Sequence, residues 1–134
     1  MTHLWLGLSL AIAPTGAWIA VTGSWSWLPV ILSVAVIFWV AAFDIIYSLQ
    51  DVEFDRTNRI FSIPAKIGES KAMWVARAMH LISWMAIVIF GILAGIGWPY
   101  LAAAFLIGIL LIVEHSIASP WDFRKIGIIP LEIF

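Results

Sequence analysis

The chain has 134 residues, of which 63% are hydrophobic and only 11% are charged, and its mean hydropathy is +1.06. A soluble domain of this length cannot cover so much apolar surface, so the composition excludes an ordinary soluble globular protein and predicts a membrane protein. The chain contains no cysteine, which excludes disulfides, thiolate catalysis and zinc sites built from thiolates.

Four apolar stretches are each long enough to cross a membrane as a helix. They run from about Leu4 to Thr22, Leu28 to Leu49, Ala72 to Ala94 and Trp98 to Ile117. The first stretch lacks the basic start and the cleavage site of a signal peptide, so we interpret it as a retained span. The sequence therefore predicts an all-α, polytopic transmembrane helix bundle of about four spans, with residues 1–134 forming a single transmembrane domain.

Basic residues are confined to the connector at residues 50–71, the start of the third span and the divergent tail at residues 119–134. The full set is Arg56, Arg59, Lys66, Lys71, Arg77, Arg124 and Lys125. An even number of spans puts the connector and both termini on one side, and the positive-inside rule makes that side cytoplasmic. We expect an integral protein of the bacterial inner (cytoplasmic) membrane, with its site on the cytoplasmic side.

Three aspartates lie in the last turns of the second apolar stretch and just beyond it. At about 100° per residue, Asp44, Asp51 and Asp55 share a narrow stripe of one helical face with Ser48, and Tyr47 lies on its flank. A carboxylate at membrane depth is costly, so several on one face are typical of a polar cavity or a cation site. Oxygen donors of this kind suit Mg²⁺ together with a substrate that bears phosphate.

The neighbouring cations have two interpretations. Lys71 and Arg77 are expected to fix topology and to contact lipid head groups. Arg56 and Lys66 lie so close to the aspartates in the sequence that contact with a diphosphate is as good an interpretation as contact with lipid.

Polar residues inside the third and fourth spans are expected to be structural. A lone histidine such as His80 more often makes one interhelical hydrogen bond than takes part in chemistry. Glu114 and His115 lie near the cytoplasmic end of the last span, and for Glu114 we expect a hydrogen bond to a neighbouring helix.

A second class of function stays open on these residues alone. A small non-enzymatic membrane protein or a transporter-like subunit would also use aspartates in its spans. Transport sites tend to lie near the bilayer midplane, whereas Asp51 and Asp55 are expected at the cytoplasmic end beside arginine, which favours phosphate chemistry. No basic patch of the kind that binds nucleic acid is present, so we expect no nucleic-acid partner.

The motif Asp44-x-x-Tyr47-x-x-Gln50-Asp51-x-x-x-Asp55 resembles the second aspartate-rich motif of the UbiA family of intramembrane aromatic prenyltransferases. Ser62-Ile-Pro-Ala65 and Gly68 match the stretch that follows it. Ala76-Arg-x-x-His80-Leu and Glu114-His115-Ser116 resemble the branch that contains 4-hydroxybenzoate and menaquinone-pathway prenyltransferases. The resemblance covers about residues 3 to 120 and corresponds to the second half of a family member.

The resemblance implies a bundle of about nine transmembrane helices with two aspartate-rich motifs at the cytoplasmic mouth of a central cavity. Mg²⁺ would join those carboxylates to the diphosphate of a polyprenyl donor. Ionisation of the donor gives an electron-poor prenyl carbon, and an aromatic acid attacks it in the biosynthesis of ubiquinone or menaquinone. Gaps between helices that open to membrane lipid would admit the prenyl tail.

Site residues follow from the same resemblance. Asp51 and Asp55 would be catalytic Mg²⁺ ligands, and Asp44 would be an additional ligand or a group that supports one. The residues that would bind substrate are Tyr47, Gln50, Arg56 and Lys66. The tyrosine and the glutamine would shape the site or hydrogen-bond within it, while the two cations would neutralise phosphate oxygens.

The chain departs from the family in one important respect. The first motif, N-D-x-x-D-x-x-x-D, is absent, and the only asparagine is Asn58 in the connector. The tail after Pro120 is too short for a further span. The sequence thus predicts a truncated or frame-shifted product, or one half of a split protein whose partner is a missing N-terminal half. We expect the chain to be inactive by itself, because one carboxylate cluster holds a diphosphate poorly.

Overall fold

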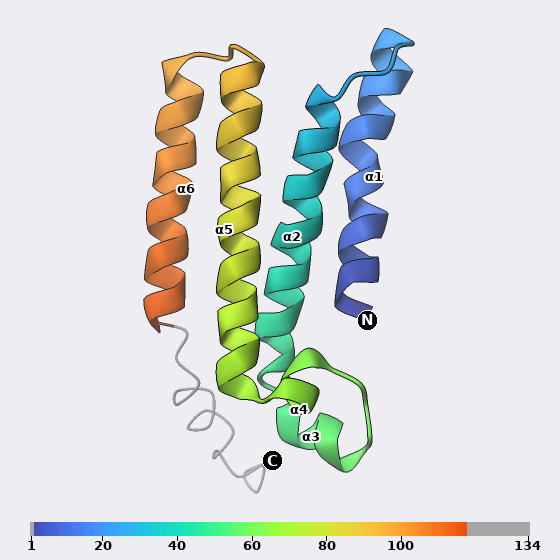
Figure 1. Cartoon of the computed structure of the whole chain (residues 1–134), viewed down its shortest axis with the longest axis vertical. Coiled ribbons are helices and arrows are strands. Elements are labelled where there is room, and N and C mark those ends of the chain that lie inside the picture. Colours follow the sequence, from blue (N-terminus) through green and yellow to red (C-terminus); the bar gives the residue numbers. More distant parts are fainter. Residues whose placement is uncertain (1, 118–134) are drawn as a thin grey trace, which may run out of the picture.

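The computed structural model describes the backbone of residues 2–117 and the side chains of residues 5–117 (Figure 1). All regular structure in this part of the chain is helical. Its elements in order are α1 (Thr2–Thr22), α2 (Leu28–Ser48), α3 (Val52–Thr57), α4 (Ile63–Ile67), α5 (Glu69–Leu93) and α6 (Trp98–Ile117). The predicted all-α class is confirmed.

Four of these helices, α1, α2, α5 and α6, are long and apolar enough to cross a membrane, as predicted. Their bounds agree with the expected spans to within about one helical turn. The largest difference is at α5, which begins at Glu69 and not at Ala72. Gly68 precedes it with a φ of 88°, a left-handed conformation that suits glycine and separates α4 from α5.

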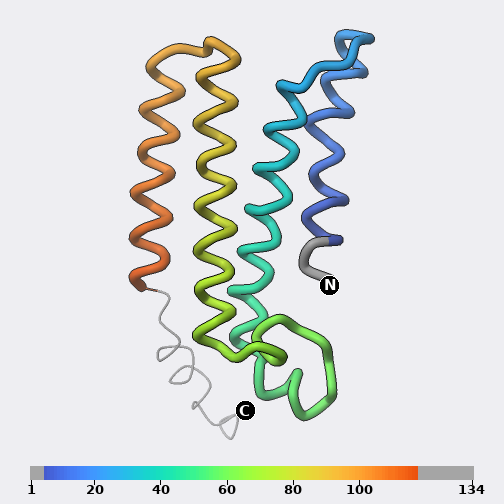
Figure 2. The backbone as a smooth tube through the Cα atoms, in the orientation of Figure 1, coloured from blue at the N-terminus to red at the C-terminus, as the bar shows by residue number. Residues whose placement is uncertain are grey.

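The four long helices stand side by side in the order α1, α2, α5, α6 and alternate in direction (Figure 1). Short links join α1 to α2 and α5 to α6 at one end of the bundle (Figure 2). The opposite end, which we call the connector end, holds the start of α1, the short helices α3 and α4, and the end of α6. This arrangement agrees with the expectation that the connector and the end of the fourth span share a side.

Helix α2 packs between α1 and α5 through small residues and short polar contacts. A Cβ atom on Gly7 of α1 would lie 2.6 Å from the carbonyl oxygen of Ile37 in α2, so only glycine permits this approach. The hydroxyls of Thr15 and Ser33 share a hydrogen bond of 2.8 Å across the same interface. In a membrane the hydrophobic effect does not drive helices together. Close packing at small residues and hydrogen bonds between helices hold them in contact instead.

A cluster of buried apolar residues joins α2 to α5 at the connector end. Its members are Ala42, Ile45, Ile46, Leu49, Ala72, Met73 and Ala76, and Ile63 of α4 packs against it. The cluster therefore anchors the connector to the end of the bundle, directly beside the aspartates.

Helix α6 is attached along one narrow line. Ala104 is its only buried residue among those described. The indole Nε1 of Trp84 donates a hydrogen bond of 2.8 Å to the Ala104 carbonyl, and the Tyr100 hydroxyl donates one of 3.0 Å to the Ile87 carbonyl. Most of the remaining α6 surface is exposed and apolar, which suits contact with lipid or with further helices.

Candidate functional site

The three aspartates lie on two helices and on the turn between them. Helix α2 ends at Ser48, and the amides of Leu49 and Gln50 donate to carbonyls three residues back, at 3.2 and 3.0 Å. This tighter pattern ends the α-helix, and α3 begins again at Val52. The prediction of one continuous helical face bearing all three aspartates is therefore wrong, because the chain turns between Asp44 and Asp55.

The aspartates differ in exposure. Asp44 is half-buried on α2, Asp51 is exposed at the N-cap position of α3, and Asp55 is buried on α3 with only 7% of its surface accessible. The main-chain amide of Ile60 donates a hydrogen bond of 2.8 Å to the Asp55 carbonyl, which closes a turn at the end of α3 where Arg59 has a φ of 55°. The structure thus places all three at the connector end, in three distinct environments.

The residues that the resemblance assigns to substrate are all exposed at the same end: Tyr47, Gln50, Arg56 and Lys66. Lys66 lies on α4, which packs against both α2 and α3. The fold therefore brings these side chains to the end of the bundle that holds the aspartates.

The stretch that follows the aspartate motif folds as the short helix α4, with Ser62 and Gly68 as its cap residues. Ser62 is buried, and its hydroxyl accepts a hydrogen bond of 3.3 Å from the amide of Ala65, which caps the N-terminus of α4. Pro64 is fully buried beneath this turn. The match to Ser62-Ile-Pro-Ala65 thus corresponds to a packed element, and the exposed Lys66 lies on its helix.

Mg²⁺ fits the aspartates by donor chemistry. It prefers hard oxygen ligands and usually takes one or two carboxylates, completing its shell with phosphate oxygens and water. Asp51 and Asp55 provide such carboxylates. Within residues 5–117, however, the aspartates do not gather into a group of three converging ligands. The donor set therefore suits an ion that a substrate phosphate helps to hold, and not a closed three-carboxylate cage.

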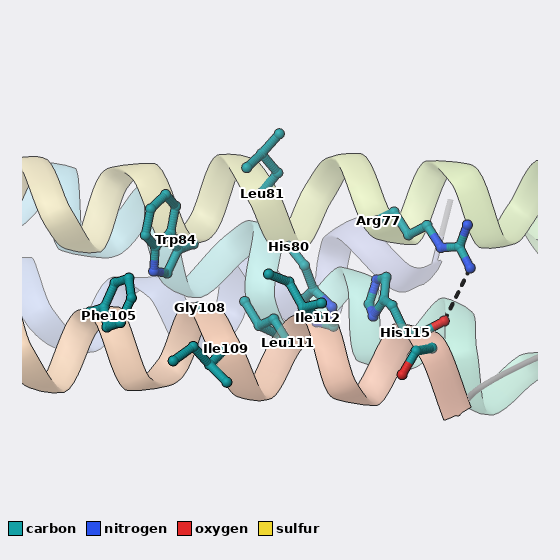
Figure 3. A pocket seen from close by; sticks show the side chains of 11 residues that line it. Arg77, His80, Leu81, Trp84, Phe105, Gly108, Ile109, Leu111, Ile112 and His115 are labelled. Atoms are coloured by element: carbon teal, nitrogen blue, oxygen red, sulfur yellow. Dashed lines mark hydrogen bonds between the residues drawn. The ribbon is translucent and has the colours of Figure 1, made fainter.

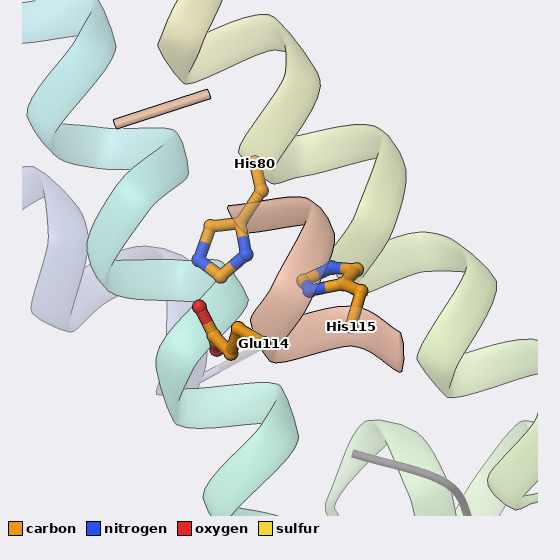
Figure 4. A group of neighbouring side chains, drawn as sticks. All are labelled: His80, Glu114 and His115. Carbon is orange, nitrogen blue, oxygen red and sulfur yellow. The ribbon is translucent and has the colours of Figure 1, made fainter. Parts of the chain in front are cut away.

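A second group of polar side chains gathers between α5 and α6. His80 of α5 and Glu114 and His115 of α6 approach one another, with their ligand atoms all within 4.8 Å (Figure 4). His80 is 2% exposed, and neither of its ring nitrogens has a hydrogen-bond partner. The expected interhelical hydrogen bond from His80 is thus not formed by strict geometry, although the main chain of Trp39 on α2 lies close to its ring. The sequence contains one indication that these residues could meet. The motif with His80 and the motif with Glu114 and His115 both lie toward the connector end of neighbouring antiparallel spans.

A groove of about 580 Å³ runs beside this group between α5 and α6 (Figure 3). Its walls are largely apolar and aromatic, formed by Leu81, Trp84, Phe105, Gly108, Ile109, Leu111 and Ile112. Its polar end contains Arg77, His80 and His115. The guanidinium of Arg77 donates a hydrogen bond of 3.1 Å to the His115 carbonyl and lies 5.1 Å from the centre of the Trp74 ring.

Comparison with known proteins places the chain in a family. The model of the UbiA prenyltransferase family matches residues 1–126. No curated protein and no solved structure matches the chain significantly. Members of this family are prenyltransferases that act within membranes, which agrees with the apolar bundle and with the carboxylates at its connector end. Because the match extends over nearly all of its residues, the chain belongs to the UbiA prenyltransferase family.

Proposed function

We propose that the chain takes part in Mg²⁺-dependent transfer of a polyprenyl group from polyprenyl diphosphate to an aromatic acid in quinone biosynthesis. The observation that carries this proposal is the position of Asp51 and Asp55. They begin and line a short helix at the end of a membrane bundle, with Arg56 beside them. Family membership favours this enzyme over the non-enzymatic or transporter-like alternative.

In this proposal Asp51 and Asp55 hold Mg²⁺, and Asp44 supports them from the end of α2. When bound, the ion stabilises the negative charge that builds on the leaving diphosphate. The chain's own cations act on the same charge: the exposed Arg56 and Lys66 neutralise phosphate oxygens from α3 and α4.

Tyr47 and Gln50 complete the proposed site. Tyr47 is 66% exposed at the last turn of α2, and Gln50 is exposed in the turn that follows. Both side chains thus stand free to hydrogen-bond substrate beside the carboxylates. A prenyl tail is an apolar hydrocarbon chain, as are the tails of lipids, so the apolar surfaces of the long helices suit the tail of the donor.

We also propose that the connector end faces the cytoplasm, in a bacterial inner membrane. The exposed cations Arg56, Arg59, Lys66 and Lys71 all lie at this end. A positively charged connector stays on the cytoplasmic side during insertion. The site would then meet water-soluble diphosphate head groups and aromatic acids from that side.

The chain would contribute one of two opposed aspartate motifs, as the second half of a family member does. The resemblance requires a first motif of the type N-D-x-x-D-x-x-x-D, which these 134 residues do not contain. Prenyl transfer would therefore need a partner that supplies it, such as an N-terminal half with the matching helices.

The test is a transfer assay on membranes that contain the chain together with the N-terminal half of a UbiA-family enzyme. Mg²⁺, a polyprenyl diphosphate and an aromatic acid are supplied. We expect prenylated product, lost on chelation of Mg²⁺ and lost in Asp55→Asn, which keeps the side chain's size but removes its charge.

The matched control is Glu53→Gln, since Glu53 is an exposed acid on the same helix. It should leave transfer unchanged. Full transfer by Asp55→Asn would show that this carboxylate does not hold Mg²⁺, and equal loss in both variants would point to a general effect of charge on α3.

A further inference from the structure

We propose that His80, Glu114 and His115 form a binding site for a divalent transition-metal ion such as Zn²⁺. This site is distinct from the aspartates in both place and chemistry. It lies between α5 and α6 inside the bundle, while the aspartates lie on α2, α3 and the turn that joins them. The proposal does not depend on the prenyl-transfer reaction.

The three ligand atoms lie almost close enough together to bind one ion. One ligand atom from each of the three side chains lies within 4.8 Å of the other two. Around a tetrahedral ion with bonds of about 2.0–2.2 Å, neighbouring ligands are roughly 3.3–3.6 Å apart. Small rotations of the side chains therefore bring all three onto one ion. In Figure 4, a carboxylate oxygen of Glu114 points toward the His80 ring, with His115 alongside.

The histidine nitrogens lack hydrogen-bond partners among the residues that the structure describes. Both ring nitrogens of His80 and both of His115 are buried without a hydrogen bond. An unsatisfied buried polar group costs about 1–3 kcal/mol, and lipid cannot relieve it. A hydrogen bond donated to the Glu114 carboxylate would satisfy only one of these nitrogens, whereas an ion would bind one nitrogen of each ring at once.

Aromatic packing already holds the His80 ring in position. Its centre lies 5.4 Å from that of Trp39, 4.9 Å from that of Phe43 and 5.0 Å from that of His115. The main chain of Trp39 also approaches this ring without meeting hydrogen-bond geometry. Backbone carbonyls commonly accept the second N–H of a metal-bound histidine and orient it. The site is therefore preorganised from α2 as well as from α5 and α6.

Donor chemistry selects the class of ion. Imidazole nitrogens suit Zn²⁺, Fe²⁺, Ni²⁺ and Cu²⁺, whereas Mg²⁺ prefers oxygen ligands and water. The Glu114 carboxylate offsets part of the ion's charge. Arg77, a cation that lines the same groove, donates from its guanidinium to the His115 carbonyl and lies over the Trp74 ring, and Figure 3 shows it directed away from His80. Three protein ligands leave a position that opens to the groove.

The test is a metal titration of the full chain, purified in detergent with a histidine-free tag and stripped by a chelator. Co²⁺ serves as the spectroscopic probe and Zn²⁺ as its competitor. We expect one Co²⁺ per chain with visible ligand-field bands, displacement by Zn²⁺, and no displacement by an excess of Mg²⁺. Zn²⁺ should also raise the midpoint of thermal unfolding, because it links α6 to α5.

Three variants remove one ligand each: His80→Ala, Glu114→Gln and His115→Ala. Each should weaken Zn²⁺ binding at least about tenfold, and the Gln variant should do so although it keeps the size of the side chain. The matched control is His3→Ala, which changes the one histidine of the chain outside the proposed site. This variant should bind Zn²⁺ as the parent does.

Circular dichroism checks that each variant keeps its helices. If His80→Ala unfolds, the two less buried variants on α6 decide the result. The proposal is wrong if the parent chain binds no Co²⁺ or Zn²⁺, since the histidines would then be satisfied by other contacts. Binding that survives all three substitutions would equally reject it, because the ions would be held elsewhere.

Discussion

The hydroxyl of Ser83 donates a hydrogen bond of 2.7 Å to the main-chain carbonyl of Ala35, across 48 residues of sequence. Both residues are buried at the contact between α5 and α2. Small side chains let the two helices approach closely, and the hydroxyl provides a specific polar contact where water is absent. This pair therefore sets how the helix that carries Asp44 sits against the helix that carries His80.

Replacement of Ser83 by alanine should destabilise the bundle by about 0.6 kcal/mol, and by no more than about 2 kcal/mol, because one interhelical hydrogen bond is lost. Loss of helicity in mixed detergent micelles of rising SDS content measures the change. Ser9→Ala is the control, since its hydroxyl bonds only within α1. Equal stability of the two variants would contradict the role of the Ser83 contact.

Topology can be tested with reporter fusions. A reporter at Thr57, the last residue of α3, and one at the C-terminus should both report the cytoplasm. The reason is the exposed positive charge of the connector, which resists translocation. A fusion in the link at Gly95 should report the opposite side. A periplasmic signal from Thr57 would overturn the proposed orientation.

Asp51 offers a clean separation of chemistry from stability. It is exposed, and its side chain makes no capping hydrogen bond to α3. Asp51→Asn should therefore change the unfolding free energy by less than about 0.5 kcal/mol. In membranes that also supply the first motif, we expect prenyl transfer to fall by about a hundredfold or more, because a charged ligand is lost. Unchanged transfer would remove Asp51 from the proposed Mg²⁺ site.

Residues 1–134 expressed alone should enter the membrane, because all four long helices are apolar enough to insert. Product formation from polyprenyl diphosphate and an aromatic acid should be absent, since only one of two carboxylate clusters is present. Membrane fractionation and a transfer assay check the two statements separately. Mg²⁺-dependent transfer by the purified chain, abolished in Asp51→Ala, would show that a single motif suffices.

Much of this architecture is readable from the sequence, because the cost of placing a residue in lipid is local and nearly additive. The spans beginning at Leu28 and Trp98 start in the structure where hydropathy predicted them. The motif that contains Asp51 and Asp55 indicated the UbiA family, and the family match confirms that membership. The branch, the half of the protein and the roles of the aspartates stay predictions.

Only the tertiary structure decided which polar residues meet. The turn at Leu49–Asp51 breaks the expected acidic stripe. The prediction of that stripe uses a period of about 100° per residue, which holds only while the helix is continuous. His80 meets Glu114 and His115 through the rotation and offset of two separate helices. Hydropathy shows which segments cross the membrane, but it does not give the rotation or the offset of one helix against another. Contacts between helices depend on small residues and close packing in three dimensions, and these bring the histidines together.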